Sequence, residues 1–147
     1  MAKSFKLDIV TPERLFYEGD VELVILRTTG GDEGFMANHS WACKLLDVGE
    51  IWIQEAGQKD FKIAAGSPGF VDVKGEVMVF VDAAEWQGDI DLSRAQNEKE
   101  RAEAILNSRK GPVPSDDDDE EYKQAQVSLN KALNRMKVAK GGRRAKA

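Results

Sequence analysis

The stretch "GDIDLSRAQNEKERAEAIL", residues 88–106, separates two parts of the chain that have different patterns. Before it, apolar residues alternate in short runs bounded by glycine, proline or charge, which is typical of β-strands. Within it and after it, apolar residues recur with the period of an amphipathic helix. The pattern therefore predicts an N-terminal antiparallel β-sandwich (flattened barrel) over residues 1–87. An antiparallel two-helix hairpin is expected over residues 88–140.

Six segments of the first part have the composition of strands. In the segment 5–10, Phe5, Leu7 and Ile9 alternate with polar residues, as in a strand with one buried face. Pro12 is expected to end it. The run 21–26 is apolar at nearly every position, which favours a strand covered on both faces. The other expected strands are 50–54, 61–66, 69–75 and 76–82.

Two glycine-containing stretches are predicted to be turns. Residues 28–34, "TTGGDEG", follow the run 21–26, and Gly75 is expected to supply the positive φ of a tight hairpin. The apolar residues of the strands should form the core. The predicted core residues are Phe5, Leu7, Ile9, Leu23, Ile25, Trp52, Phe61, Ile63, Phe70, Val71, Val79 and Val81.

The first helix is expected to begin after Asp89 or Asp91, because either carboxylate can accept hydrogen bonds from the free N–H groups of a first turn. Its predicted apolar stripe is interrupted by Lys99. The stripe consists of Leu92, Ala95, Ala102 and Leu106.

An acidic linker is predicted at about residues 109–119, because its glycine and prolines are poor helix formers and its aspartates repel one another. A second helix should follow at about 120–140, and residues 141–147 should be a flexible basic tail. The stripe of the second helix contains Tyr122, Ala125, Leu129, Ala132, Leu133, Met136 and Ala139. Because such stripes bury little apolar surface, the hairpin should be marginally stable alone and suited to switching.

Composition and charge argue against several functions. The net charge of −5 and a pI near 5.0 do not suit a nucleic-acid-binding protein, which needs clustered basic residues. No segment has the length and apolarity of a membrane span or signal peptide, so we expect a cytosolic protein without direct membrane insertion. Cys43 is the only cysteine, and we expect a buried, unreactive thiol.

Motifs for catalysis or metal binding are weak. His39 and Cys43 have the spacing of a possible catalytic pair, but nothing in the sequence places them within hydrogen-bond reach, and a structural histidine is favoured. Residues 28–34 lack the lysine and hydroxyl of a phosphate-binding P-loop. The acidic run 115–121 lacks the glycine bend of a calcium loop. We therefore expect no catalytic residue and no metal site.

The spacing of Asp91, Arg94 and Arg101 allows two interpretations. On a helix both guanidinium groups project from one side, where they can bind phosphate oxygens, and the nearby carboxylate can accept from a ribose hydroxyl or an adenine amine. Alternatively, Asp91 pairs with Arg94, and Glu98 or Glu100 pairs with neighbouring cations, as ordinary surface ion pairs. The spacing alone leaves both open.

Several strings resemble the epsilon subunits of bacterial F-type ATP synthases. They are "FKLDIVTPERLFYEGDVELVILRTTGGDEGFMANHSW" (5–41), "GSPGFVDVKGEVMVFVDAAE" (66–85), "IDLSRA" (90–95) and "ALNRMKVA" (132–139). They cover nearly the whole chain in the family's order.

This resemblance implies a non-catalytic subunit of the rotor, or central stalk, that couples ion translocation to ATP synthesis. It implies binding to the gamma subunit and the c-subunit ring, as a peripheral protein on the cytoplasmic face of the cell membrane. The hairpin would restrain ATP hydrolysis by extending along gamma toward the alpha and beta subunits. No cofactor would be required, although some relatives bind ATP as a regulatory ligand.

The resemblance also implies residue roles. The nucleotide-binding residues would be Glu85, Asp91, Arg94, Arg101, Lys131 and Arg135, with Lys131 where nucleotide-binding relatives have arginine. Lysine keeps the charge but loses the planar fork of arginine. The loop 35–41, "FMANHSW", lacks the proline common in relatives; its expected partner-contact residues are Phe35, Met36, His39 and Trp41. The alternatives are a free-standing ATP-sensing module and a small enzyme that uses His39 or Cys43.

Overall fold

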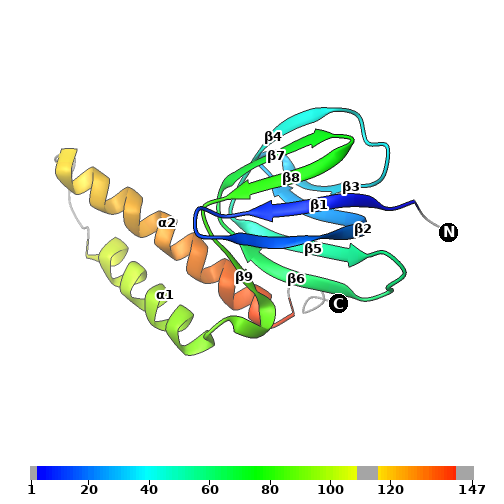
Figure 1. Ribbon diagram of the computed structural model, residues 1–147. Helices are drawn as coiled ribbons and strands as arrows, with labels where there is room; N and C mark the ends of the chain where they lie inside the picture. The colour runs from blue at the N-terminus through cyan, green and yellow to red at the C-terminus, as the bar shows by residue number, and fades with distance from the viewer. Residues whose placement is uncertain (1–2, 109–115, 142–147) are drawn as a thin grey trace. The chain divides into compact units, whose positions relative to one another are not determined.

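The computed structural model describes residues 3–108 and 116–141, with the side chains of 116–119 left aside (Figure 1). The chain divides after Asp89 into two compact units. We refer to them as the β unit, up to Asp89, and the helical unit, from Ile90 onward.

The β unit contains nine strands among its described residues. They are β1 (Phe5–Val10), β2 (Leu15–Thr28), β3 (Gly31–Phe35), β4 (Ala42–Leu46), β5 (Gly49–Glu55), β6 (Phe61–Gly66), β7 (Gly69–Lys74), β8 (Glu76–Val81) and β9 (Ala84–Trp86). A single turn of 3₁₀ helix, η1 (Gln87–Asp89), ends the unit.

The strands close on themselves, which confirms the predicted flattened barrel (Figure 1). β1 pairs with both β2 and β8, and the ring continues through β7 and β4 back to β2. From β2 the sheet extends through β5 and β6 to β9, and β3 pairs with β2. The pairs are antiparallel except β1 with β8, which is parallel and aligns Leu7 with Val77.

A register irregularity in β2 decides which of its side chains enter the core. Pairing with β5 shifts between Val21 and Leu23, as at a β-bulge. An extra residue reverses the in–out alternation, so Val24 and Leu26 are buried. The predicted core positions Leu23 and Ile25 are therefore wrong, because both are only half-buried on the other face.

Most of the remaining core prediction is confirmed. The buried members are Phe5, Leu7, Ile9, Trp52, Ile63, Val71, Val79 and Val81. Phe61 is only half-buried, with its ring against that of Trp52. Phe70 is exposed because β7 directs Val71 and Val73 inward, so Phe70 lies on the outer face and stacks on Phe80.

Strands β3, β4 and β9 were not predicted from the sequence. Within the predicted turn 28–34, only Thr29 and Gly30 form the turn, and β3 starts at Gly31, whose φ is +120°. The β3 sequence "GDEGF" has low strand propensity, but its backbone pairs with β2 from Thr28 to Val24. The hairpin at Gly75 is confirmed, with a φ of +81°.

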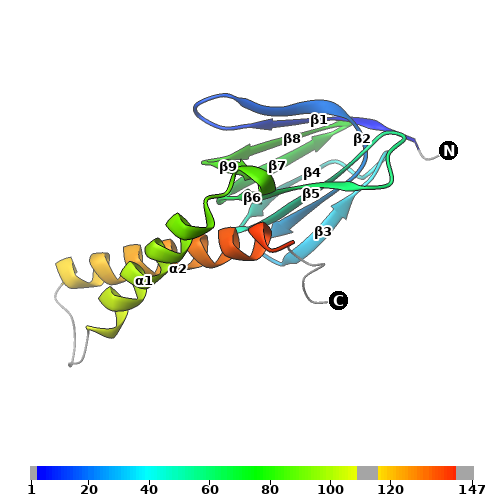
Figure 2. The ribbon, with the colours of Figure 1, turned by 90° about the horizontal axis from the view of Figure 1, so that it is seen from below.

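The helical unit contains α1 (Leu92–Asn107) and α2 (Asp116–Ala139), which lie side by side and antiparallel (Figures 1 and 2). Asp91 is the N-cap of α1, since its Oδ1 accepts from the backbone N–H of Arg94 at 3.1 Å. α2 begins at Asp116, so residues 116–119 are helical rather than part of the linker. The other predicted linker residues, 109–115, and residues 142–147 of the predicted tail lie outside the described residues.

The buried residues of the two helices are mostly alanines. They are Ala95 and Ala102 in α1 and Ala125, Ala132 and Val138 in α2. Val138 was not predicted, and the expected stripe members Leu92 and Leu133 are 42% and 43% exposed. No helix in the described residues is long and apolar enough to cross a membrane.

Candidate functional site

One candidate surface lies around the turn between β3 and β4. Phe35 ends β3 and is fully buried, which fixes the start of the turn in the core. Its ring centroid lies 4.9 Å from that of His39. Asn38 has a φ of 65°, a conformation that asparagine tolerates better than most residues, and His39 N–H closes the turn on the Met36 carbonyl.

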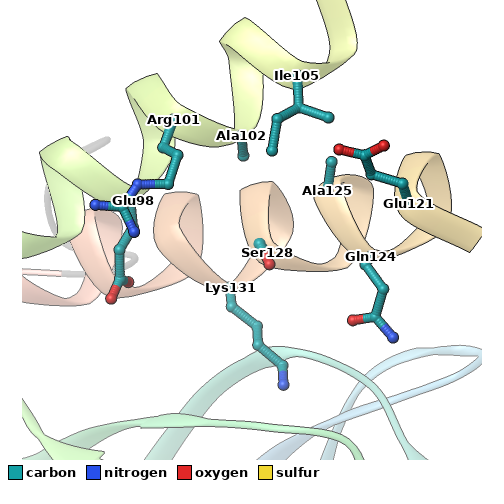
Figure 3. A pocket seen from close by; sticks show the side chains of 9 residues that line it. All are labelled: Glu98, Arg101, Ala102, Ile105, Glu121, Gln124, Ala125, Ser128 and Lys131. Atoms are coloured by element: carbon teal, nitrogen blue, oxygen red, sulfur yellow. The ribbon is translucent and has the colours of Figure 1, made fainter.

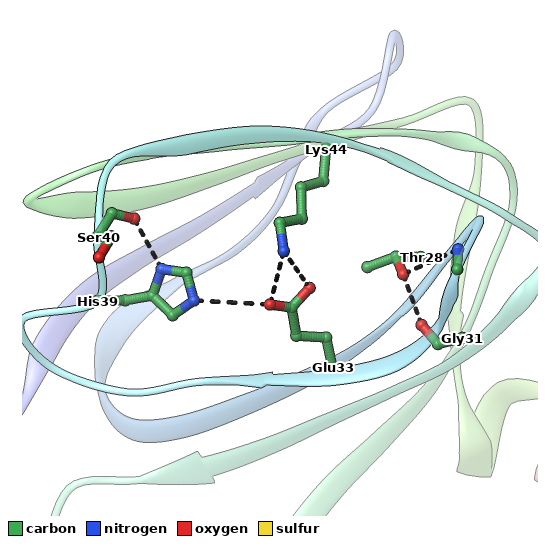
Figure 4. Close-up of polar contacts among 7 residues, drawn as sticks. Thr28, Gly31, Glu33, His39, Ser40 and Lys44 are labelled. Carbon is green, nitrogen blue, oxygen red and sulfur yellow. Dashed lines mark hydrogen bonds and ion pairs between the residues drawn. The ribbon is translucent and has the colours of Figure 1, made fainter.

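Glu33 connects this turn to β4 (Figure 4). Lys44 Nζ lies 2.7 Å from both carboxylate oxygens of Glu33. His39 Nε2 lies 3.7 Å from Glu33 Oε1. The hydrogen bonds from Lys44 hold the pKa of Glu33 below its usual value. Since β3 and β4 are not paired with each other in the described sheet, these side chains provide a polar link between them.

The contacts of His39 do not indicate catalysis. Its Nδ1 lies 2.7 Å from the Ser40 carbonyl oxygen, so this nitrogen carries a proton and donates. The other contacts described for the ring are with Glu33 and Phe35, not with Cys43. The expectation of a buried Cys43 is wrong, because alternation along β4 places its thiol on the exposed face.

The four expected partner-contact residues differ in exposure. Met36 is 59% exposed and Trp41 is 77% exposed, so both are available to a partner, and His39 is half-buried. The expectation that Phe35 contacts a partner is wrong, because its side chain is fully buried and cannot reach another molecule.

An apolar row crosses the outer face of the closed sheet near the end of β4 that lies away from this turn, where the Leu45 carbonyl accepts from the Thr29 N–H of the β2–β3 turn. Its members are aligned in register: Val10 with Phe80, Phe80 with Phe70, and Phe70 with Leu45. Leu45 is 66% exposed and Phe70 is 41% exposed. We call these four residues the apolar row. Exposed apolar residues that adjoin one another, unlike scattered ones, are typical of an interaction surface.

A second candidate site lies on the helical unit, centred on Glu98. Glu98 Oε1 is 3.4 Å from Arg94 Nε, one turn earlier on α1. Its Oε2 accepts a hydrogen bond of 2.9 Å from Arg135 Nη1 on α2. One carboxylate thus connects two of the predicted nucleotide-binding arginines across the hairpin.

A pocket of about 370 Å³ adjoins this carboxylate. Figure 3 shows Ala102, Ile105 and Ala125 between the two helices, whereas Lys131 and Gln124 extend away from α1. Its lining residues are Glu98, Arg101, Ala102, Ile105, Glu121, Gln124, Ala125, Ser128 and Lys131. An apolar floor with a few charged groups at its rim is a common form of small-molecule site.

The structure distributes the predicted nucleotide-binding residues as follows. Arg94 and Arg135 meet at Glu98, and Arg101 and Lys131 line the adjoining pocket. Asp91 caps α1. Glu85 belongs to β9 of the β unit, where it is aligned with Ala65 of β6.

From the sequence, Glu98 was expected only as one member of a surface ion pair. The signal for its larger role was its position, four residues after Arg94 and three before Arg101, which places all three on one helix face. The contact with Arg135 was not predictable from spacing, because it depends on how the two helices pack. Among the described residues, no cluster of histidine, cysteine and carboxylate side chains is placed to hold a metal ion.

Two domains of one known protein family match the β unit and the helical unit, in the same order along the chain. Residues 4–87 match the β-sandwich domain of the ATP synthase delta/epsilon chain, and residues 89–140 match its long α-helix domain. The chain belongs to the ATP synthase delta/epsilon family. The resemblance found in the sequence is confirmed, as is the assignment to the epsilon subunits of F-type ATP synthases.

Similar family members are bacterial ATP synthase epsilon chains. That of Caldanaerobacter subterraneus is 40% identical over 95% of this chain and 96% of its own length. That of Alkaliphilus oremlandii is 46% identical over 76% of this chain and 82% of its own length.

Solved structures share the family's fold at lower identity. A chain of the Euglena gracilis mitochondrial ATP synthase, in a complex of OSCP, F1 and c-ring, aligns with a TM-score of 0.74 at 20% identity. The alignment covers 89% of this chain and 78% of that one. A chain from the central stalk and c-ring of the Tetrahymena thermophila enzyme aligns with a TM-score of 0.60 at 10% identity, over 92% and 98% of the two chains.

Proposed function

We propose that this chain acts in the rotor of the ATP synthase as a non-catalytic subunit. The β unit binds the gamma subunit and the c-subunit ring, and the helical unit serves as a movable brake on ATP hydrolysis. The brake engages the alpha and beta subunits when the hairpin extends. The complex places the chain on the cytoplasmic face of the membrane as a peripheral protein.

The exposed side chains of the β unit support the proposed partners. The apolar row and the turn residues Met36 and Trp41 present apolar area to solvent, although the barrel behind them has a complete core. Leaving such area uncovered is unfavourable in water, and burial in an interface removes that cost. We assign these two exposed apolar areas to the contacts with gamma and the c ring.

The packing of the hairpin supports the proposed brake. The buried side chains of α1 and α2 are mostly alanines, which contribute little hydrophobic free energy. A switch needs such a weakly held element, because moving a two-state equilibrium from 1:99 to 99:1 takes about 5.5 kcal/mol of differential binding. A hairpin with a large apolar interface would be too stable for one ligand or partner to move.

The observation that carries the proposal is the match to both family domains in order, with a firmly packed β unit joined to a thinly packed hairpin. The test is ATP hydrolysis by the reconstituted complex, with the whole chain or with a chain that ends at Asp89. We expect faster hydrolysis with the shortened chain and equal binding to gamma. Equal hydrolysis rates would reject the brake, and loss of gamma binding by the shortened chain would reject the division of roles.

We propose ATP as the regulatory ligand of the hairpin, bound by Arg94, Arg101, Lys131 and Arg135 together with Glu85 and Asp91. Guanidinium groups bind phosphate oxygens in bidentate fashion, and the pocket beside Glu98 has the size of a small-molecule site. Lys131 supplies charge without the fork, which weakens that contact.

Calorimetry of ATP binding tests this ligand. Changing Arg94 and Arg101 together to alanine should abolish the heat of binding. The control changes Lys3 and Lys59, two exposed lysines of the β unit, and so removes the same charge elsewhere. Unchanged binding by the arginine variant would place the nucleotide away from this helix face.

A further inference from the structure

Glu98 occupies the position that an anionic ligand of the hairpin would need. Its two oxygens contact different helices, Arg94 of α1 at 3.4 Å and Arg135 of α2 at 2.9 Å. A phosphate group would be bound by the same guanidinium N–H donors, since carboxylate and phosphate are alternative partners of the arginine fork. The chain thus carries its own anion in the proposed ATP site.

We infer that Glu98 is an internal competitor of ATP, a carboxylate that holds Arg94 and Arg135 and must be displaced before the phosphates can bind. This inference rests on the proposed function of the helix face as an ATP site. Glu98 would then determine the affinity of the hairpin for ATP, and therefore the ATP concentration to which the hairpin would respond.

The two contacts of Glu98 are of unequal weight. The Arg94 side chain is 72% exposed, and water screens its pair with Glu98. The Arg135 side chain is 19% exposed, and its shorter hydrogen bond is less screened. Glu98 therefore competes with the phosphates mainly for Arg135. The Glu98–Arg135 ion pair also connects α1 to α2.

When the phosphates of ATP displace Glu98 from the arginines, the neighbouring cations give them further partners in the pocket. Arg101 and Lys131 line the pocket that Glu98 also lines, and no described carboxylate forms an ion pair with either of them. An incoming polyphosphate can therefore contact these two cations before it takes Arg135 from Glu98. Glu121, at the rim of the same pocket, adds negative charge that opposes entry.

Calorimetry of the full chain with ATP tests the inference, using Glu98→Gln, which removes the charge and keeps the size of the side chain. Glu100→Gln is the matched control, because it makes the same charge change on the same helix. The contact described for Glu100 is with Gln96, at 3.1 Å, and not with a cation. We expect Glu98→Gln to raise the ATP association constant about ten-fold, which corresponds to about 1.4 kcal/mol. The control should change it less than about two-fold, because exposed charges at a distance are screened.

Loss of the Arg135 pair could also loosen the hairpin, so helix content is followed by circular dichroism and a second variant is included. Glu98→Ala removes the competitor and adds helix propensity, and it should give a similar gain in affinity. If wild-type protein binds ATP and neither variant binds it more tightly, the inference is overturned and the ATP site stands. If no protein binds ATP, the ATP site and its competitor are both rejected. If only the Glu98 variants bind, the competitor is supported and ATP is rejected as the ligand of the natural chain.

Discussion

The β unit and the helical unit are held together in different ways. The β unit closes its strands into a ring and fills it with large side chains such as Phe35, Leu7 and Leu26. The helical unit has one helix–helix contact, with buried alanines and a carboxylate shared by two arginines. Large apolar cores resist local opening, whereas small interfaces open at low free-energy cost. We therefore expect the β unit, the body of the molecule, to keep its shape and the helical unit, its arm, to change its state when a ligand or partner binds.

The largest expected effect is in the core of the β unit. Phe35→Ala should lower the free energy of unfolding by about 3–5 kcal/mol, because it leaves a cavity at a fully buried position. Trp41→Ala, at the exposed end of the same turn, is the control and should change it by less than about 0.5 kcal/mol. Urea unfolding followed by tryptophan fluorescence of Phe35→Ala would measure the first value. A cost below about 1 kcal/mol would contradict a rigid β body.

Unfolding of the whole chain tests the comparison directly. All three tryptophans, Trp41, Trp52 and Trp86, belong to the β unit, so their fluorescence reports on it. Circular dichroism at a helix wavelength reports mainly on α1 and α2. We expect the helix signal to be lost at a urea concentration about 1 M lower, the shift that a difference of about 2 kcal/mol produces. Coincident transitions would show one cooperative unit and would remove the basis for a separate arm.

The start of α1 gives a smaller effect. Asp91→Ala should destabilise the helical unit by about 1 kcal/mol, because it removes the N-cap that accepts from the Arg94 N–H. Asp89→Ala makes the same charge change two residues earlier, outside α1, and should cost little. Thermal melts followed by circular dichroism would compare the two variants. Equal melting temperatures for them would mean that the cap does not set the stability of the arm.

The smallest effect concerns the polar link at the β3–β4 turn. The pKa of Glu33 is lowered in the folded chain, chiefly by the hydrogen bonds from Lys44. The contribution of ionised Glu33 to the free energy of unfolding is therefore present above the unfolded pKa of about 4.3. It is lost as the pH falls through the lower pKa of the folded chain. Because the pair is partly exposed, we expect less than about 1 kcal/mol.

The measurement is urea unfolding, followed by tryptophan fluorescence, between about pH 6 and pH 3, a range that includes the unfolded pKa. Glu33→Gln should flatten part of the decline in stability that the natural chain shows. An identical pH profile for the two proteins would show that this link contributes nothing to the body.

Much of the fold was predictable, because hydrophobic periodicity is a local property. The strand with Phe5, Leu7 and Ile9, the Gly75 hairpin and the change to helices near residue 88 all follow from neighbouring residues. Strand β3 was missed because its glycines and acids have low strand propensity and form a strand only through pairing with β2. The faces on which Leu23 and Ile25 lie were predicted wrongly, because one irregularity in register moves every later side chain of the strand to the opposite face.

The candidate site was predictable only in part. The face of α1 that carries Arg94 and Arg101 follows from their spacing, and the family resemblance added Lys131 and Arg135. The resemblance also suggested Phe35 as a contact residue, but its side chain is buried in the structure. The sequence does not distinguish the apolar residue that packs into the core from the apolar residues of the same turn that remain exposed. The Glu98 contact with Arg135 depends on which turn of α2 faces α1.

The sequence by itself determined the two kinds of secondary structure, the place where one gives way to the other, and the family. It did so because period, turn residues and charge act over a few neighbours along the chain. Only the tertiary structure decided which side chains face the core of the barrel, that Phe70 and Leu45 form an exposed row, and that Glu98 holds two arginines. Each of these depends on the alignment of segments far apart in the chain, and that alignment is set by packing between them.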